Sequence, residues 1–485
     1  MSHSRLLSLP DELLLEILSE LDVFSLLRST EVCHVLRSFV KPSTILQYKV
    51  QLTLAGMKDG PPTSEGSSSR LRRLETHQAA WHDLQWSSKQ TFSLNDVRLW
   101  ELAGGVLGLV YAENIFNFTR LPSSLRGMEQ KEWKVEVDKN FDLLDFSMDV
   151  SNDLLVVLRR ENAQITVHLL SLSTGKPHSK TATPILTCLV DVDHVGSTFD
   201  IRIFGQNLGV LFDSVYGTKS ELFIWNWQTG TQYPSHSFIF LFAFLTENLV
   251  LLNPVPRRPH IYPGSTIIDL KKPDNPVFLF LPKLREDVDL ESVETHCESV
   301  NPQNDDVPFT SSTDDRLFVI IYRLFDDNGD MESYALFLPL STILSAIANS
   351  HLHRPYRYRL FEEWAAKRCR LMQLDVPEVW VCYVHGMKAA IYDKTLCKTR
   401  IFDFNQFALR YDLAQAERPK DWEYLTEESV ISSFSPVVHT SLRGRVRSVS
   451  LQATTDAVML AEDSLMAIHD EGEDDKEDAV VVFSF

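Results

Sequence analysis

The pattern of apolar and polar positions divides the chain into a short helical part and a long part rich in strands. Up to about residue 85, apolar residues recur three and four positions apart, which predicts amphipathic helices. From about residue 91 this periodicity is lost, and short β-rich runs separated by polar turns replace it. The pattern therefore predicts an N-terminal helical region followed by an all-β domain.

The stretch from Leu7 to Val40 is the densest in leucine and predicts three short helices. Pro10 suits the first turn of the first helix, where the N–H that proline lacks would have no partner. Asp22 is placed to cap the second helix, and Ser29 or Thr30 to cap the third. Three helices of this length cannot enclose so many leucines. The excess is expected to meet either the rest of the chain or another protein.

Two further helices are expected before the β-rich part begins. Pro42 ends the third helix, and residues 44–56 predict a fourth. Residues 58–69 are rich in Gly, Pro and Ser and predict a linker or loop. A second helix of this linker region is expected from about Ser69 to Gln85, with Trp81 on its apolar side. It could serve as a spacer, pack on the next domain, or do both.

Strand spacing in the β-rich part favours a β-propeller. Four-stranded blades take roughly 40–50 residues each. The shorter intervals between strand starts fit one blade, and the longer ones fit a blade with an insertion. The candidate starts lie near residues 106, 154, 208, 249, 317, 379 and 457. The prediction is a WD-like propeller of about seven blades over residues 91–485, although the Gly–His and Trp–Asp signatures of WD repeats are absent.

Three details of this β domain remain open. An eighth blade could lie around residues 400–404, and two stacked β-sandwiches are the main alternative fold. The last strand, residues 479–483, is expected to pair with a strand near 91–94 or 106–111 and close the ring. A short helix capped by Ser341 is expected between blades, and Trp364 is expected in a loop beside two acids.

Composition and charge narrow the classes of partner. The 485 residues are 44% hydrophobic, which is enough for a large core, and the net charge of −19 disfavours wrapping nucleic acid or an anionic membrane. Residues 443–447 form the best local basic patch, although a solvated strand end is the simpler interpretation. The acidic run 470–478 is interpreted as a solvated hairpin loop rather than a contact for a basic partner or calcium.

Cysteine usage and hydropathy predict a soluble protein of the cytoplasm or nucleus. Six cysteines without dense spacing fit a reducing compartment. The first residues do not read as a signal peptide, because they lead directly into the leucine-rich stretch. The most apolar run, residues 237–245, is too short to span a bilayer.

Motifs for catalysis or cofactors are absent from the sequence. It contains no phosphate-binding loop, dinucleotide fingerprint, HExxH, nucleophile elbow or EF-hand loop. A zinc site at Cys369, Cys382, His385 and Cys397 was weighed, but strand cysteines usually behave as small buried apolar groups. No catalytic residue, metal or cofactor is therefore expected.

The leucine-rich stretch resembles an F-box. The family pattern has a leucine–proline pair, then acid, leucine and isoleucine at helical steps, a leucine-rich second helix and a valine–cysteine pair. The matching residues here are Leu9, Pro10, Glu12, Leu13, Ile17, Leu18, Leu21, Leu26, Leu27, Val32 and Cys33. The usual tryptophan three residues after the cysteine is replaced by Leu36. The resemblance covers residues 1–45, leaves 46–90 as a helical linker, and is set against a generic leucine-rich helical hairpin.

This resemblance implies the substrate-recognition subunit of a Skp–cullin–F-box ubiquitin ligase. The F-box would bind the Skp-family adaptor, and through it cullin, while the propeller would bind an unidentified protein substrate. The chain as a whole looks like the F-box proteins that fungi encode in large numbers. The expected adaptor-binding residues are Leu9, Pro10, Leu13, Ile17, Leu18, Leu21, Leu26, Leu27, Val32 and Cys33.

Two alternatives stand beside this hypothesis. In the first, the chain is a protein-interaction scaffold outside any ligase, with the F-box-like helices packed internally. In the second, it is a propeller enzyme that acts through acids at the central channel. The repeated SxDxGxTW boxes of propeller sialidases are absent from the sequence, which disfavours the enzyme.

Overall fold

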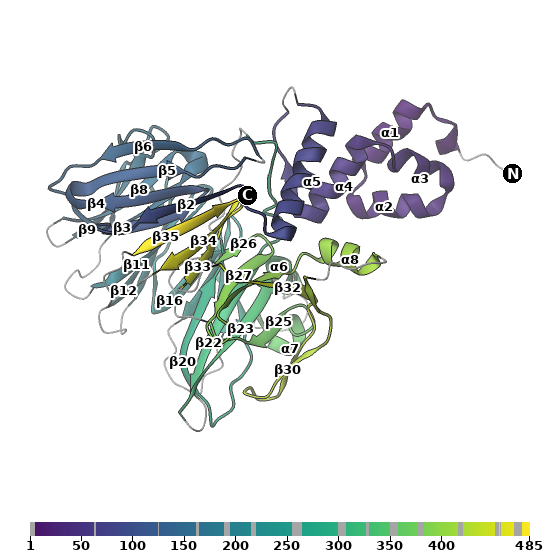
Figure 1. Cartoon of the computed structure of the whole chain (residues 1–485). Coiled ribbons are helices and arrows are strands. Elements are labelled where there is room, and N and C mark those ends of the chain that lie inside the picture. Colours follow the sequence, from purple (N-terminus) through teal and green to yellow (C-terminus); the bar gives the residue numbers. More distant parts are fainter. Residues whose placement is uncertain are drawn as a thin grey trace.

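A computed structural model shows a helical arm joined to a ring of β-sheets (Figure 1). It describes residues 5–485 except 63–64, 125, 162–163, 189–194, 215–219, 255–263, 299–306, 326–328, 350–356, 377–382, 416–420, 452–454, 456 and 470–477. The arm lies on one side of the ring, and the C-terminal strands of the chain lie near the place where the arm meets it. Within the described residues, no helix is long and apolar enough to cross a membrane.

The helical arm contains five α-helices and one 3₁₀ turn. Pro10 precedes the first helix, and the Asp22 side chain accepts the backbone N–H of Ser25 to cap the second, as predicted. Gly56 ends the fourth helix in a left-handed conformation with φ of 70°. The elements are η1 (Arg5–Ser8), α1 (Asp11–Glu20), α2 (Val23–Val32), α3 (His34–Val40), α4 (Thr44–Ala55) and α5 (Ser67–Asp83).

The prediction that Ser29 or Thr30 caps the third helix is wrong. Both residues lie inside α2, where their hydroxyls donate to the carbonyls of Leu26 and Leu27 three residues back. The break falls at Cys33, whose extended backbone (φ −158°, ψ 161°) separates α2 from α3. Apolar spacing alone could not locate this break, because the apolar positions continue through it.

The core of the arm is completed by α4. The third helix ends before Pro42, and α4 then packs against both α1 and α2. Leu46 and Val50 of α4 are buried together with apolar residues of the first three helices, namely Leu14, Leu18, Val23, Leu26, Leu36 and Val40. The fourth helix therefore helps to enclose leucine side chains that three short helices could not bury alone. We call α1–α4 the helical domain.

The β-rich part is a propeller of seven blades, numbered here in chain order (Figure 1). The first three blades are antiparallel sheets, and the arrangement of seven separate sheets in a ring (Figure 1) excludes the β-sandwich alternative. Their strands are β3 (Leu99–Ala103), β4 (Val106–Tyr111), β5 (Ile115–Arg120) and β6 (Lys131–Glu136); β7 (Asp142–Asp149), β8 (Leu154–Glu161), β9 (Gln164–Ser171) and β10 (Ile185–Cys188); and β11 (Val195–Phe204), β12 (Asn207–Ser214), β13 (Glu221–Asn226), β14 (Thr231–Gln232) and β15 (His236–Ser237).

Blades 4 to 6 carry additional elements at their edges. Their strands are β16 (Ile239–Phe244), β17 (Leu249–Pro254), β18 (Gly264–Asp269), β19 (Lys272–Phe280) and β24 (Tyr358–Arg359); β20 (Asp289–His296), β22 (Leu317–Phe325), β23 (Met331–Pro339) and β25 (Arg370–Gln373); and β26 (Val384–His385), β27 (Lys388–Asp393), β28 (Lys398–Asp403), β29 (Glu423–Leu425) and β32 (Gly444–Val449). Two small ladders pair β1 (Met57–Asp59) with β21 (Phe309–Ser311) and β30 (Ser429–Ile431) with β31 (Val438–Thr440).

Blade 7 closes the ring with strands from both ends of the β-rich part. It contains β33 (Ala457–Leu460), β34 (Ser464–His469), β35 (Ala479–Ser484) and, on its outer edge, β2 (Ser88–Ser93). The antiparallel register pairs Ser88 with Ser484 and Ser93 with Ala479. The predicted closure is thereby confirmed, and the early partner is the strand at 88–93. Closure removes edges that could otherwise pair with other chains.

The predicted eighth blade is wrong. Residues 398–403 form β28, an inner strand of blade 6 that pairs with both β27 and β32. The long interval between the strand starts near residues 379 and 457 arises because α8 (Gln406–Ala414) and the short strands β29, β30 and β31 lie between β28 and β32 in the chain. Most of the predicted strand at 379–384 lies outside the described residues.

The interruption in blade 5 differs from its prediction in two ways. The helix α6 (Leu340–Ala348) lies inside the blade, between β23 and β25, rather than between blades. Asp315 caps it by accepting the Ser341 backbone N–H at 2.9 Å and the Ser341 hydroxyl at 2.7 Å, so Ser341 is not the cap. Trp364 ends a short helix, α7 (Phe361–Trp364), where it is buried and donates its indole N–H to the Phe280 carbonyl.

Candidate functional site

The helical domain carries more large apolar side chains than its core uses. On α1, Leu14 and Leu18 point into the core, whereas Leu13 and Ile17, one position earlier, are exposed by 47% and 41%. Because residues four apart share a helix face, α1 has one apolar stripe inside and another outside. The exposed apolar residues of this region are Leu6, Leu7, Leu13, Ile17, Phe24, Leu27, Val32, Val35 and Ile45. We call this set the apolar helical surface.

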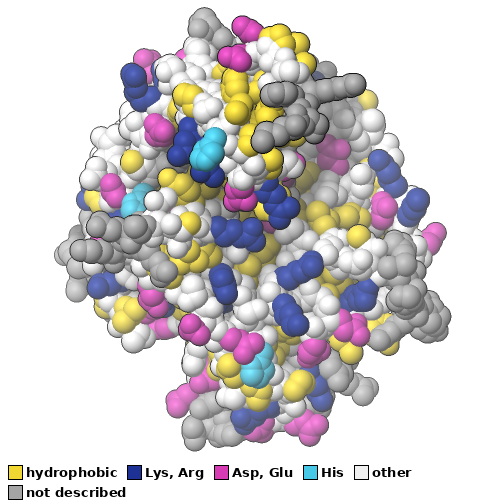
Figure 2. Space-filling view, turned by 90° about the vertical axis from the view of Figure 1, so that its right-hand side faces the viewer, with side chains coloured by type: hydrophobic (Ala, Val, Ile, Leu, Met, Phe, Trp, Pro, Cys, Tyr) yellow, Lys and Arg dark blue, Asp and Glu magenta, His cyan; other side chains and the backbone are white. Residues whose placement is uncertain are grey.

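Figure 2 looks at the molecule from the side of the helical arm. Hydrophobic side chains gather in the upper part of this view, where the arm projects toward the viewer. Single exposed leucines are common on proteins, whereas a concentration of this kind on one small domain marks an interaction surface. This surface also contains a cation: the Arg28 guanidinium lies 4.1 Å from the centre of the Phe24 ring.

The ten expected adaptor-binding residues fall into three groups. Pro10, Leu13, Ile17, Leu27 and Val32 are exposed, with Val32 the most exposed at 75%. Leu9, Leu21 and Cys33 are half-buried. Leu18 and Leu26 are only 3% and 0% exposed and belong to the core of the domain.

The assignment of Leu18 and Leu26 to a binding surface therefore needs correction. Both side chains hold the domain together, because helical spacing that places one stripe outward places its neighbour inward. Phe24, Val35 and Ile45 are exposed in their place and were not among the expected residues. The sequence could have indicated Phe24, because it lies three residues before Leu27 and so shares a helix face with it. Leu36, which stands where an F-box usually has tryptophan, is buried in the core.

The arm is joined to the propeller by two polar networks, of which the second is buried and the first is partly exposed, because the Asp59 side chain is 54% exposed. In the first, the Arg70 guanidinium of α5 binds Asp59 at 2.6 Å, and the Tyr48 hydroxyl of α4 lies 2.8 Å from the same carboxylate. The Tyr48 hydroxyl also lies 3.1 Å from the carbonyl of Pro308, next to β21. Burial and the neighbouring Asp59 carboxylate raise the pKa of Tyr48, so it stays a neutral donor.

The second network centres on Asp463, in the turn between β33 and β34. The fully buried His77 of α5 places Nε2 at 2.9 Å from Asp463, and Arg126, from the turn after β5, places Nε at 2.6 Å. Arg126 also binds Glu462 at 2.9 Å. Burial alone would raise the pKa of Asp463, but the Arg126 charge and the His77 hydrogen bond outweigh it and hold the pKa well below its ordinary value. The arm is therefore fixed to blades 1 and 7.

The basic run 443–447 is part of the structural framework of blade 6. Arg445 binds the buried carboxylate of Asp403 at 2.6 Å and also pairs with Asp412 of α8. Arg447 pairs with Asp421 and donates to the carbonyl of His82. The expectation of a solvated strand end is wrong for Arg445 and Arg447, which are largely buried and paired, whereas Arg443 is exposed.

Cys369, His385 and Cys397, the described residues of the possible zinc site, do not form a metal site. Cys369 is buried and Cys397 is exposed, while His385 places Nε2 at 2.8 Å from the Ser311 hydroxyl. Cys382 lies outside the described residues. Across the part of the chain that the structure describes, no group of three or more His, Cys, Asp or Glu side chains could hold a metal ion. Residues 470–477 of the acidic run also lie outside, between the antiparallel strands β34 and β35.

Comparison with known proteins assigns the helical domain. Residues 6–46 match the F-box-like family model, so the chain carries an F-box-like domain followed by a seven-bladed β-propeller. The matched range covers η1 and α1–α3 and reaches into α4. The search of curated proteins found no match to the chain.

Solved structures show only distant similarity. The N-terminal domain of Nup159 covers 82% of this chain and 95% of its own at 10% identity, with a TM-score of 0.34. The uncharacterised protein lmo1340 from Listeria monocytogenes covers 64% and 92% at 10% identity, with a TM-score of 0.28. Prp20p from Saccharomyces cerevisiae covers 75% and 82% at 9% identity, with a TM-score of 0.29. Scores this low say nothing about function.

Proposed function

We propose that the protein is the substrate-recognition subunit of a Skp–cullin–F-box ubiquitin ligase. Its F-box-like domain binds a Skp-family adaptor, and its propeller binds the protein to be ubiquitylated. One observation carries this proposal: the domain has a complete core of its own, yet α1 still presents Leu13 and Ile17 to solvent. A helical surface with apolar anchors at steps of three and four is suited to a groove on a partner.

The chain itself supplies no chemistry in this proposal. Its contribution is to hold the target near the transferring machinery in a fixed orientation, which raises the effective concentration of the reacting groups. The networks at Asp59 and Asp463 support this role, because the first brings Tyr48 of α4 to the carbonyl of Pro308 and the second binds His77 of α5 to the buried Asp463. A flexible linker would allow far more orientations.

The position of the arm also suggests which end of the ring binds the target. The arm contacts the turn that joins the first and second strands of blade 7, where His77 binds Asp463, and the Asn405 side chain, just after β28 of blade 6, donates to the carbonyl of Leu54. Because adjacent strands run antiparallel, connections between second and third strands lie at the opposite end of each blade. We place the target at that opposite end, since loops on a rigid scaffold commonly carry binding.

Co-purification with the adaptor tests the proposal. Replacing Leu9 and Pro10 together by alanine is expected to abolish co-purification with a Skp-family adaptor while the propeller stays folded. Leu396 and Val430 are exposed apolar residues of the propeller, and alanine at both is the control that should retain the adaptor. Undiminished co-purification of the Leu9 and Pro10 variant would contradict the assignment. A stable wild-type monomer without adaptor would instead indicate a scaffold outside the ligase.

A pull-down with a truncated chain separates the two partner classes. Partners that are lost when residues 1–45 are removed belong to the ligase machinery, and partners that are retained are candidate targets. Because α4 and α5 anchor the remaining chain to the ring, the circular dichroism of the truncated protein must first show native strand content. Loss of every partner from such a folded truncation would contradict target binding by the propeller.

A further inference from the structure

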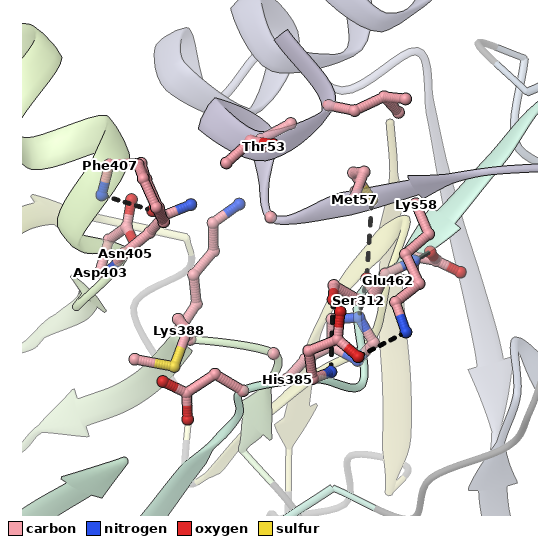
Figure 3. A pocket seen from close by; sticks show the side chains of 18 of the residues that line it. Thr53, Met57, Lys58, Ser312, His385, Lys388, Asp403, Asn405, Phe407 and Glu462 are labelled. Atoms are coloured by element: carbon pink, nitrogen blue, oxygen red, sulfur yellow. Dashed lines mark hydrogen bonds and ion pairs between the residues drawn. The ribbon is translucent and has the colours of Figure 1, made fainter. Parts of the chain in front are cut away.

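A pocket of about 460 Å³ lies where the helical arm meets the propeller (Figure 3). Its walls come from the end of α4 and from β1, from Trp81 of α5, and from turns of blades 5, 6 and 7. Pockets of this size commonly hold small molecules. We call it the junction pocket. It lies apart from the apolar helical surface, so its role does not depend on adaptor binding.

Most charged side chains in the wall of the pocket have partners within the wall or just behind it. The carboxylate of Asp314 binds Lys58 at 2.8 Å, and Asp403 is held by Arg445 at 2.6 Å. Glu462 binds Arg126 at 2.9 Å. Each of these three acids therefore has a cationic partner.

The remaining acid and the histidine of the wall also have partners in the protein. Asp315 accepts two hydrogen bonds from Ser341 at the start of α6. The imidazole of His385 lies 2.8 Å from the Ser311 hydroxyl through Nε2 and 3.2 Å from Glu298 through Nδ1. Both side chains of the wall are thus occupied by the protein.

Lys388 is different. Its side chain rises from the start of β27 into the pocket, toward the end of α4 near Thr53 (Figure 3). Among the residues that the structure describes, none forms a hydrogen bond or ion pair with its ammonium group. Its closest favourable contact is the Trp81 ring, whose centre lies 5.0 Å from Nζ. Burial and the Arg445 charge lower the pKa of Lys388, against the opposing influence of Asp403.

Lys388 is half-buried, so its ammonium group is open to the pocket, and none of the described carboxylates forms an ion pair with it. Asp403 is the acid that raises the pKa of Lys388, but the Asp403 carboxylate is already held by Arg445. An incoming anion would supply the missing partner at short range, where the surrounding protein screens charges weakly. The rest of the lining is largely apolar and includes Leu52, Met57, Trp81, Met387, Phe407 and Leu460.

We propose that the junction pocket binds a small organic anion, with its carboxylate or phosphate on Lys388 and its apolar body against Trp81 and Phe407. The walls belong to both the arm and the ring, so such a ligand binds the joined form of the two. Ligand binding of this kind raises stability in proportion to the logarithm of ligand concentration. The ligand would thus strengthen the connection between the F-box-like domain and the propeller.

Calorimetry and thermal unfolding with simple probes test this proposal. Phenyl phosphate and benzoate represent the two acid groups on an aromatic body, and benzylamine and benzyl alcohol are the matched cationic and neutral probes. At millimolar concentrations, at least one anion is expected to raise the Tm of the full-length protein and to give a saturable heat, whereas benzylamine and benzyl alcohol do neither. If phenyl phosphate alone binds, the group is a phosphate, and if benzoate alone binds, it is a carboxylate.

Substitution at Lys388 shows whether the anion lies where we propose. Lys388→Met keeps the length of the apolar stem and removes the charge, so it should weaken binding of the anion at least tenfold. Lys58→Met is the matched control, because Lys58 lines the same pocket but is already paired with Asp314, and binding should stay within threefold. No response to either anion in the folded protein, or equal binding by the Lys388→Met variant, would overturn the proposal.

Discussion

Asp463 shows how one side chain can fix the position of a domain. Its carboxylate contacts α5 through His77 and the turn after β5 through Arg126. A buried carboxylate is stable only when it is paired in this way, and removing one partner of a buried pair leaves the other uncompensated. The same group therefore joins the arm, blade 1 and blade 7.

Asp463→Asn is expected to lower the free energy of unfolding by about 3–5 kcal/mol, because Arg126 and His77 lose their shared carboxylate. Urea denaturation measures the loss. Asp83→Asn, at an exposed position of α5, is the control and should change stability by less than about 1 kcal/mol. A small effect at Asp463 would show that the network does not hold the arm.

Asp463 also makes the free energy of unfolding depend on pH, in a direction that its lowered pKa defines. Its carboxyl has a lowered pKa in the folded state, so its contribution is complete above the unfolded pKa of about 3.9 and is lost as the pH falls below it. Between pH 5 and pH 2.5, the wild type should lose more stability than Asp463→Asn. Parallel curves for the two proteins would contradict the assigned pKa shift.

Glu101 of β3 presents the opposite case. Burial raises its pKa to about 8, against a hydrogen bond from Ser147 and with reinforcement from the charges of Asp145 and Asp200. A carboxyl whose pKa is raised on folding favours the folded state at low pH, and that contribution falls as the pH rises toward 8. The acids around Glu101 therefore make the propeller less stable in alkaline solution.

Glu101→Gln should remove this dependence, because the amide keeps the acceptor for Ser147 and cannot ionise. We expect the variant to be about 1–3 kcal/mol more stable than the wild type at pH 9 and little different at pH 5. Thermal or urea unfolding at the two pH values measures it. Glu132→Gln, at an exposed position of β6, should show no such difference. Equal stability at pH 9 would mean that Glu101 ionises freely.

At the scale of single elements, α1 combines two functions in one helix. Leu14 and Leu18 fill the core, and Leu13 and Ile17 form part of the apolar helical surface. Two leucines of α1 therefore serve stability, and one leucine and one isoleucine form its outer stripe. The two stripes lie one residue apart, which makes them separable by substitution.

Leu18→Ala and Leu13→Ala form a matched pair that tests this division. The first creates a cavity in the core and should destabilise the helical domain by about 2–5 kcal/mol. The second removes an exposed side chain and should change stability by about 0.5 kcal/mol or less. Hydrogen exchange of the α1–α4 amides measures both. Equal losses would show that the two stripes are equally buried in solution.

Element-level prediction succeeded where periodicity or turn chemistry is local. The helices at 44–56 and 69–85 were anticipated because their apolar residues recur regularly, and the blade count of about seven followed from the spacing of strands. The boundary at Cys33 was missed because apolar positions run through it. The cap of α6 was missed because it comes from Asp315, which is 26 residues away in the chain.

The candidate site was predicted only in part for a related reason. The F-box-like pattern identified the correct segment, but a single pattern cannot tell which of two adjacent leucines faces inward. Leu18 and Leu26 match the pattern but face inward, where Leu46 and Val50 of α4 complete the core. The junction pocket is invisible in the sequence, because its walls come from segments between Val23 and Glu462.

At the scale of the whole molecule, the arm and the ring share buried groups. Trp81 of α5 stacks on Phe485, whose ring centre lies 3.9 Å away, beside the strand that closes the propeller. The buried residues around them come from α5 and from blades 6 and 7. The helical arm and the propeller are therefore held in one arrangement.

Calorimetric titration of a purified Skp-family adaptor into the full-length chain tests the central claim most directly. The wild type is expected to form a saturable one-to-one complex, and Ile17→Asp, which places a charge on the outer stripe of α1, is expected to lose it while keeping its Tm. Leu396→Asp is the control at an exposed apolar residue of the propeller and should bind as the wild type does. Absence of a complex with the wild type, or undiminished affinity of Ile17→Asp, would contradict the account.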